Sequence, residues 1–268
     1  MVQSRHTLSK GAIQRMIDAH LHLHRYNDLD TRIPAWQAAG IQGVVAVSDD
    51  LASSYRTLEL KTNYPDFIYV AIGFHPEQQM PTRSEVDEWR RLVRAERALL
   101  SCIGEIGLPH YEAANLPQPL ESYQERLAEF LTTAEQEQLP VALHAVHNKA
   151  ELVYDSLQTY APNTPAHFHW LKAPRPALEK ITAAGYMVSV TPEACYRERD
   201  QRLAAQVPMK QLLVETDGPW PFNGPFSNKE TTPLLLIPLI EKIAEVKGVA
   251  LADASHQLQV NAVQFYGG

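Results

Sequence analysis

Three observations in the 268-residue sequence predict a single-domain α/β fold, a (β/α)8 TIM-like barrel. Short apolar runs alternate along the chain with longer amphipathic segments, which is the pattern of parallel strands joined by helices. Eight such units follow one another, and a barrel of this type takes about 250 residues. Most of the apolar runs also end in histidine or acidic residues. No glycine-rich dinucleotide-binding turn follows the first run, so an open doubly wound sheet is the weaker alternative.

The strands and helices of this barrel are expected at definite places. The predicted strands are residues 16–22, 43–47, 67–74, 100–104, 141–144, 166–170, 186–190 and 211–215. Amphipathic segments such as 84–100 and 120–139 are predicted to be helices, and the last two helices are expected at 231–248 and 252–263. The proline-rich segment 217–226 is predicted to be a long ordered loop.

The composition limits the class of protein. The formal net charge is −7 and the pI is about 5.9, whereas proteins that hold nucleic acid mainly by its phosphates usually carry a basic surplus. A nucleic-acid substrate would therefore need a local basic rim or metal ions. The two cysteines, Cys102 and Cys195, cannot form a disulfide framework, and we expect them to be reduced thiols.

The sequence also carries expectations about domains and location. No apolar run approaches the ~18 residues of a membrane span, and residues 1–15 lack the apolar centre of a signal peptide. We expect residues 1–15 to be a disordered extension or a cloning remnant and residues 16–268 to form the barrel domain. A cytoplasmic enzyme without a membrane partner, monomeric or a small homo-oligomer, is the expectation.

Side chains of the types that bind metals stand at the ends of six of the predicted strands. In such a barrel the residues that do chemistry lie at the carboxyl ends of the strands. These strand ends carry His20, His22, His75, Glu105, His144, His169 and Asp217. Taken singly, Glu105 could be a salt-bridge partner, His144 a core histidine and Asp217 a turn cap. Unpaired carboxylates gathered in one place would resist burial, and divalent cations resolve that problem, so the shared position predicts a metal centre.

The alternation of side chains along a strand predicts which residues point into the barrel mouth. On the first strand, Asp18, His20 and His22 should share the inward face. The apolar residues expected on the outward face are Ile17, Ala19 and Leu21. On the last strand, Glu215 and Asp217 should share the inward face. We expect Asp18 and Glu215 either to hold the ligand imidazoles in place or to make plain hydrogen bonds inside the barrel.

Two further histidines have less defined expectations. His167 shares a face with His169 but lies deeper in the predicted strand. We expect it to have a structural role or to support the ligands from behind. His24 lies past the first strand and is expected to face solvent or the rim.

Six sequence blocks contain these strand ends. They are IDAHLH, IGFHPE, CIGEIGLPHY, LPVALHAV, FHWLKAP and LVETDGPW. In order and spacing they resemble the signature blocks of the TatD-type metal-dependent hydrolases, a branch of the amidohydrolase-like superfamily. The resemblance runs from Met16 to the final helix. It implies a TIM-like barrel, a divalent metal centre and deoxyribonuclease activity on phosphodiester bonds.

The resemblance also implies roles for single residues. The metal ligands would be His20, His22, Glu105, His144, His169 and Asp217. The histidine of the IGFHP block, His75, would contact a substrate phosphate. Our hypothesis is that two cations (Mg, Mn or Zn) share Glu105 and a water, with His20, His22 and Asp217 at one site and His144 and His169 at the other. Glu105 and Asp217 would be the catalytic residues, because Asp217 would orient the water or accept its proton.

Three blocks depart from the pattern of the family. Where members often read GEIGLDYY, this chain has Pro109 and His110 and loses an acidic residue. Where many read IHSR, a basic residue has become Val146. Where the sixth block is often HCFSG, this chain has Trp170 and Lys172. The departures suggest a side branch with altered substrate handling.

The expected substrate contacts come from loops at the same end of the barrel. The aromatic candidates are Trp170, Trp220, Phe222 and Phe226, which would either stack on the bases of a single strand or pack within their loops. The basic candidates are Lys149, Lys172, Arg175, Arg197 and Arg199, which would form a local rim or remain solvated surface charges. Of these, Trp170, Lys172 and Trp220, together with His75, are our predicted substrate-binding residues.

Three functions remain open at this point. The first is a metal-dependent DNase, by family analogy a 3′-exonuclease acting on single-stranded or nicked DNA. The second is a metal-dependent hydrolase of another ester or amide, such as a lactone, a cyclic phosphate or a D-aminoacyl-tRNA. The third is a subunit of a defence or repair assembly, against which the full set of ligand residues argues.

Overall fold

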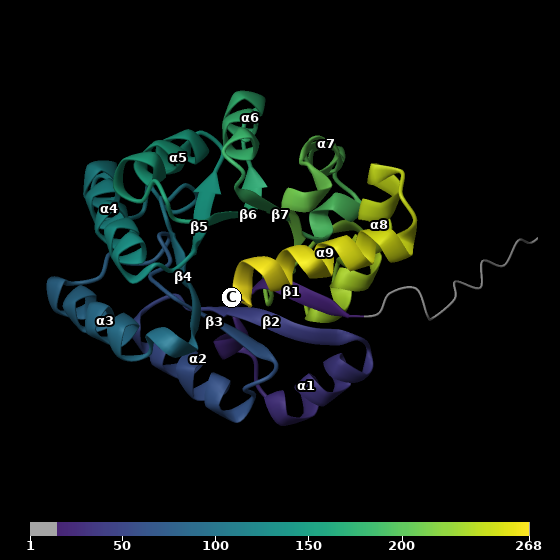
Figure 1. Ribbon diagram of the computed structural model, residues 1–268, viewed down its shortest axis with the longest axis horizontal. Helices are drawn as coiled ribbons and strands as arrows, with labels where there is room; N and C mark the ends of the chain where they lie inside the picture. The colour runs from purple at the N-terminus through teal and green to yellow at the C-terminus, as the bar shows by residue number, and fades with distance from the viewer. Residues whose placement is uncertain (1–14, 268) are drawn as a thin grey trace, which may run out of the picture.

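The computed structural model describes residues 15–267 and confirms the predicted barrel (Figure 1). The expectation for residues 1–15 lies outside the described residues, Arg15 excepted. The strands form one parallel sheet in chain order. They are β1 (Met16–Leu21), β2 (Ile41–Val47), β3 (Ile68–Ile72), β4 (Leu100–Gly107), β5 (Val141–Val146), β6 (Ala166–Lys172), β7 (Met187–Val190) and β8 (Leu212–Val214). Beyond the end of β8, the N–H of His22 donates to Gly218 O at 2.9 Å and the N–H of Asp217 to His20 O at 3.0 Å, so this segment meets β1.

The helices surround the sheet as a ring, and the last one lies across the near end of the barrel in Figure 1. They are α1 (Leu29–Ala38), α2 (Leu51–Asn63), α3 (Arg83–Ala95), α4 (Leu120–Glu137), α5 (Lys149–Tyr160), α6 (Arg175–Ala183), α7 (Glu198–Gln206), α8 (Leu236–Lys247) and α9 (Leu251–Tyr266). Capping boxes define where α2 and α3 begin: Asp50 with Ser53, and Thr82 with Glu85. None of the helices between residues 15 and 267 is both long and apolar enough to cross a membrane.

The inner core of the barrel differs from one detail of the sequence prediction. It consists of Ile17, Ala19, Val45, Val47, Ala71, Cys102, Ala142, Met187, Leu213, Ala262 and Tyr266. Ile17 and Ala19 were predicted to face the outer helices, and this was wrong; Leu21 does belong to the outer core. The physical reason is a shift in the pairing of β1 with β2 between Asp18 and Leu21. Such a shift breaks the strict alternation of faces.

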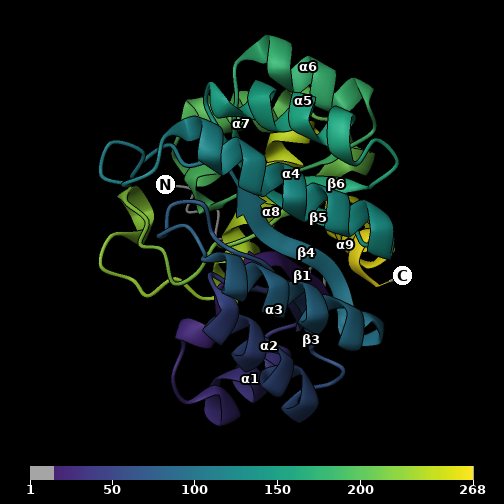
Figure 2. The same ribbon diagram turned by 90° about the vertical axis from the view of Figure 1, so that its left-hand side faces the viewer.

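Two glycines allow the segments that carry the polar residues to approach one another closely. A Cβ on Gly107 would lie 2.1 Å from the backbone oxygen of His144 on the neighbouring strand. A Cβ on Gly218, in the segment after β8, would lie 2.0 Å from the hydroxyl of Tyr26. Any other residue at Gly107 would force β4 and β5 apart, and any other residue at Gly218 would displace the Tyr26 side chain, so both glycines allow close packing at the strand ends. The segment after β8 projects beyond the left edge of the barrel in Figure 2, in yellow-green.

Candidate metal centre

The carboxylate of Glu105 lies at the centre of the predicted ligands. This side chain comes from β4 and is fully buried. Its Oε1 lies 2.7 Å from both His144 Nδ1 and His169 Nε2, and its Oε2 lies 3.0 Å from His20 Nε2. His75 Nε2 is 3.4 Å from Oε1. One carboxylate therefore contacts histidines from β1, β5, β6 and the segment after β3.

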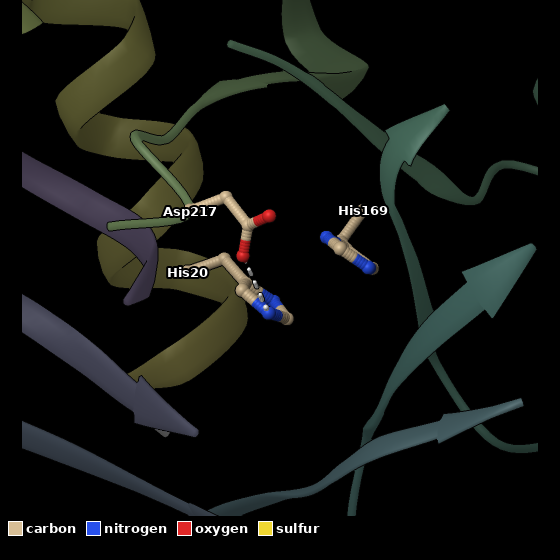
Figure 3. Close-up of side chains that lie close together, drawn as sticks. All are labelled: His20, His169 and Asp217. Atoms are coloured by element: carbon tan, nitrogen blue, oxygen red, sulfur yellow. Dashed lines mark ion pairs between the residues drawn. The ribbon is translucent and has the colours of Figure 1, made fainter. Parts of the chain in front are cut away.

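Asp217 faces this group from the segment after β8. Its Oδ1 lies 3.2 Å from His22 Nε2 and 3.7 Å from His20 Nε2. Figure 3 shows the carboxylate turned toward His20, with His169 beside it. The rings of His20 and His169 are stacked with centroids 3.9 Å apart. The structure thus brings together all six residues that the sequence predicted as ligands.

The backbone is strained at two positions around this centre. Asp217 has a φ of 49° and Trp170, which follows His169, has a φ of 36°. Residues other than glycine adopt this left-handed backbone conformation mainly where the surrounding structure imposes it. The N–H of Asp217 is held by His20 O at 3.0 Å, and the N–H of Trp170 donates to Glu215 Oε1 at 2.7 Å. These bonds fix both residues in conformations that place the Asp217 carboxylate beside the histidines and the Trp170 ring in the wall of the cavity above them.

The donor atoms are spaced as metal ligands require. Four groups of residues have ligand atoms within 4.8 Å of one another. They are His20 with His169 and Asp217, His20 with His22 and Glu105, His75 with Glu105 and His144, and His22 with His24 and Asp49. His20 belongs to two of these groups, so the geometry does not divide the ligands into the two sites that we hypothesised. The division stays a prediction.

The charges at this centre fit a cation. Burial would raise the pKa of Glu105, but the charges of His169, His75 and His20 hold that pKa well below its ordinary value. Burial lowers the pKa of His169, yet Glu105 and then Glu215 raise it well above its ordinary value overall. Asp217 Oδ1 is buried and has no well-oriented hydrogen-bond donor among residues 15–267. Because divalent cations and protons compete for such a donor set, this centre can hold metal in place of protons.

Three buried polar residues lie behind the ligands. Glu215 is 3.4 Å from His169 Nδ1, which is the contact expected of a residue that orients a ligand imidazole. Asp18 instead accepts from Thr216, from its N–H at 2.9 Å and its hydroxyl at 2.5 Å, and so ties the segment after β8 to β1. His167 Nδ1 lies 2.5 Å from the hydroxyl of Tyr266 on α9, within the barrel interior.

A cavity of about 410 Å³ opens above the ligands. The four predicted substrate-binding residues line it: His75, Trp170, Lys172 and Trp220. Lys172 Nζ lies 3.8 Å from the centre of the Trp170 ring, within cation–π distance. Phe222 and Phe226 are buried, so the packing alternative holds for these two.

The expected basic rim is neutralised in part by an acidic residue that sequence reasoning missed. Glu193 lies 3.5 Å from Lys172, 2.6 Å from Arg197 and 3.0 Å from Arg199. Arg175 points elsewhere and pairs with Glu179 at 2.7 Å. The rim is therefore three cations that share one carboxylate.

Asp49 is a second acidic residue that sequence reasoning missed. It follows β2 directly and lies 2.8 Å from His22 Nδ1, 2.9 Å from His24 Nε2 and 2.5 Å from Arg25 Nη2. Burial raises the pKa of Asp49, but hydrogen bonds from His22 and His24 outweigh burial and hold the pKa well below its ordinary value. Asp49 thus fixes the ring of a predicted ligand from its far nitrogen. The rule that strand ends carry the chemistry would have found it.

Glu77 is the third. It stands two residues after His75 and its Oε1 lies 3.0 Å from His144 Nε2. Burial would raise the pKa of Glu77, but hydrogen bonds from His144 and from the backbone of Glu112 lower the pKa to about 2. The side chain is therefore ionised at neutral pH and holds the far nitrogen of a second predicted ligand.

A (β/α)8 barrel that gathers histidines and carboxylates at the carboxyl ends of its strands is the architecture of a metal-dependent hydrolase. The chain belongs to the family described as TatD related DNase, whose sequence model matches residues 17–267. This confirms the family resemblance and the type of fold that the sequence predicted.

Known proteins similar to the chain cover nearly its whole length. A protein from Haemophilus influenzae named as an uncharacterized metal-dependent hydrolase is 34% identical, over 94% of this chain and 99% of its own. A human protein named deoxyribonuclease TATDN3 is 25% identical, over 94% of each chain. The crystal structure of a TatD homologue from Escherichia coli superposes with a TM-score of 0.82 at 23% identity, covering 96% of this chain and 99% of that one. This last likeness supports the fold.

Proposed function

We propose that the protein is a metal-dependent phosphodiesterase, a DNase that removes nucleotides from the 3′ end of single-stranded DNA. The observation that carries the proposal is the cluster of six ligand residues at the floor of an open cavity lined by aromatic and basic side chains. The family supports it. A protein from Erwinia tasmaniensis named 3′-5′ ssDNA/RNA exonuclease TatD is 26% identical over 89% of this chain.

The ligand residues would hold two divalent cations, of Mg, Mn or Zn. When bound, these cations would supply positive charge to the phosphate and lower the pKa of a water toward neutrality. Asp217 would orient that water and accept its proton. Glu105 would hold the imidazoles around it in one arrangement, since its oxygens lie 2.7–3.6 Å from five of them. His75, at the cavity wall, would donate to a non-bridging phosphate oxygen.

The walls of the cavity would hold the nucleotide. Trp220 is half exposed at the mouth, and its ring lies 6.1 Å from that of Trp170. Exposed aromatic faces of this kind stack on unpaired bases. Lys172, which lines the same cavity, would lie near the phosphate that follows in the strand.

A single assay tests the proposal. Single-stranded DNA carrying a fluorophore at its 5′ end is incubated with the protein and Mn²⁺ or Mg²⁺, and the products are separated by length. We expect a ladder of products shortened from the 3′ end, lost in Asp217→Asn. A 3′-terminal phosphorothioate should slow the reaction. Internal cleavage would refute the exonuclease part, and no cleavage with Mn²⁺, Mg²⁺ or Zn²⁺ would refute the nuclease part.

A hydrolase of another ester or amide is the second candidate. Val146 lines the cavity where members of the family often have a basic residue, and Glu193 lies against all three cations of the rim, which lowers the positive charge that the cavity offers to a polyanion. Turnover of a lactone, a cyclic phosphate or a D-aminoacyl-tRNA, without cleavage of DNA, would favour this candidate.

A further inference from the structure

The carboxylate of Glu77 collects four hydrogen-bond donors. Its Oε1 lies 3.0 Å from His144 Nε2 and accepts from the backbone N–H of His110 at 2.7 Å and of Tyr111 at 3.0 Å. Its Oε2 accepts from the N–H of Glu112 at 2.8 Å. The side chain is 9% exposed. Three consecutive backbone N–H groups thus converge on the same acidic side chain that holds a predicted metal ligand.

These N–H groups belong to the segment that joins β4 to α4, residues 108–119, which has no helix or strand. Within its middle, the N–H groups of Asn115 and Leu116 donate to Glu112 O and so stay inside the segment. Leu108, at its start, donates to His144 O at 3.3 Å. Among the hydrogen bonds of the described chain, those to Glu77 tie residues 110–112 to the segment after β3.

The segment forms one wall of the cavity through Tyr111. This side chain is about half exposed and lines the cavity. Lys172 Nζ lies 3.2 Å from the Tyr111 hydroxyl and 5.7 Å from the centre of its ring, and 3.8 Å from the centre of the Trp170 ring. The two aromatic rings therefore flank Lys172. The position of residues 110–112 therefore determines where the Tyr111 side chain lies at the wall of the cavity.

The sequence around this contact determines which N–H groups are available. The block GEIGLPHY has Pro109, and proline has no N–H, so the donors available to a carboxylate begin at His110. Glu77 reaches them from a different strand end.

We propose that Glu77 is a positioning residue that couples the orientation of His144 to the loop 108–119, and so links the metal centre to the Tyr111 wall of the cavity. An acceptor on Nε2 keeps the proton of His144 on that nitrogen and leaves Nδ1, which faces Glu105, free to bind a cation. The same carboxylate holds the loop. Only the expected effect of this coupling on substrate binding rests on the proposed function.

The test compares Glu77→Gln and Glu77→Ala with Glu125→Gln, which makes the same charge change at an exposed site on α4. Hydrogen–deuterium exchange measured by mass spectrometry reports on residues 110–112 in the metal-free protein. We expect exchange there to rise by about tenfold in Glu77→Ala and less in Glu77→Gln, whose amide oxygen still accepts. The control should match the parent protein.

Metal binding and kinetics supply the second half of the test. Titration with Mn²⁺ should show affinity lower by about tenfold or more in Glu77→Ala. At saturating Mn²⁺, KM for single-stranded DNA should rise more than kcat falls, because excess metal offsets the weaker hold on His144 while the Tyr111 wall still moves. Unchanged exchange at residues 110–112 would overturn the proposal, and so would faster exchange with unchanged Mn²⁺ affinity.

Two further observations keep this test decisive. Circular dichroism verifies that the variants fold, and Glu77→Gln remains informative if Glu77→Ala does not. If the parent protein cleaves no DNA, the proposed function fails, but exchange and Mn²⁺ affinity still decide the role of Glu77.

Discussion

The floor and the mouth of the cavity are built in different ways. The floor consists of buried side chains such as His20 and Glu105, carried by strands of the parallel sheet. The mouth consists of half-exposed side chains such as Tyr111 and Trp220, carried by loops. The strands and the segments that directly follow them therefore position the floor, whereas contacts between loops, such as those of Glu77 with residues 110–112, position parts of the mouth. Changes to the floor should abolish chemistry, and changes to the mouth should alter substrate binding.

Removal of metal should have the largest effect and would test whether the floor is a metal centre at all. Dialysis against a chelator should abolish hydrolysis, and Mn²⁺, Mg²⁺ or Zn²⁺ should restore it. Saturating metal should also raise the melting temperature by roughly 5–10 °C, since binding at a hundred times Kd contributes about 2.7 kcal/mol and each kcal/mol shifts the melting temperature of a chain of this size by about 2–4 °C. His20→Ala should lose most of this shift. Full activity after exhaustive chelation would contradict the assignment.

Asp217→Asn should have the next largest effect. The amide keeps the shape of the side chain but cannot accept the proton of the attacking water, so kcat should fall by about 10²- to 10⁴-fold. The measurement is the initial rate on single-stranded DNA at saturating metal. Asp66→Asn, an exposed site before β3, is the matched control. A loss below tenfold would mean that another group takes the proton.

Asp49→Asn should weaken metal binding at the floor of the cavity, although Asp49 is not itself a predicted ligand. Asp49 contacts His22, His24 and Arg25 at once, so the amide cannot satisfy all three. Loss of the carboxylate that orients a ligand imidazole should lower metal affinity by about 10- to 100-fold. Excess Mn²⁺ should restore most of kcat, which distinguishes this effect from that of Asp217→Asn. If Mn²⁺ affinity did not change, Asp49 would serve only to place Arg25.

The floor was more predictable from the sequence than the mouth. The strand ends could be read because apolar runs stop at His20, Glu105 and Asp217, and parallel strands of a barrel bring those ends together. The inward orientation of the Ile17 side chain could not be predicted from the sequence, because the pairing shift in β1 depends on the neighbouring strand.

The contacts of the mouth depend on loops that approach from different strands. Nothing local marks Glu193 as the partner of Lys172, or Glu77 as the acceptor for residues 110–112. Such pairings require the tertiary structure. Asp49 is the exception, since it follows a predicted strand and the same rule applies to it.

Trp220→Ala should have the smallest effect and would test the mouth alone. The ring is 55% exposed, so its loss should leave the fold and the ligands intact. Stacking on one base contributes about 1 kcal/mol at the low end, which corresponds to roughly a fivefold rise in KM for single-stranded DNA with kcat unchanged. Tyr160→Ala, an exposed aromatic at the end of α5, is the control. A fall in kcat at constant KM would place Trp220 with the floor instead, and the distinction between a barrel-built floor and a loop-built mouth would no longer describe this cavity.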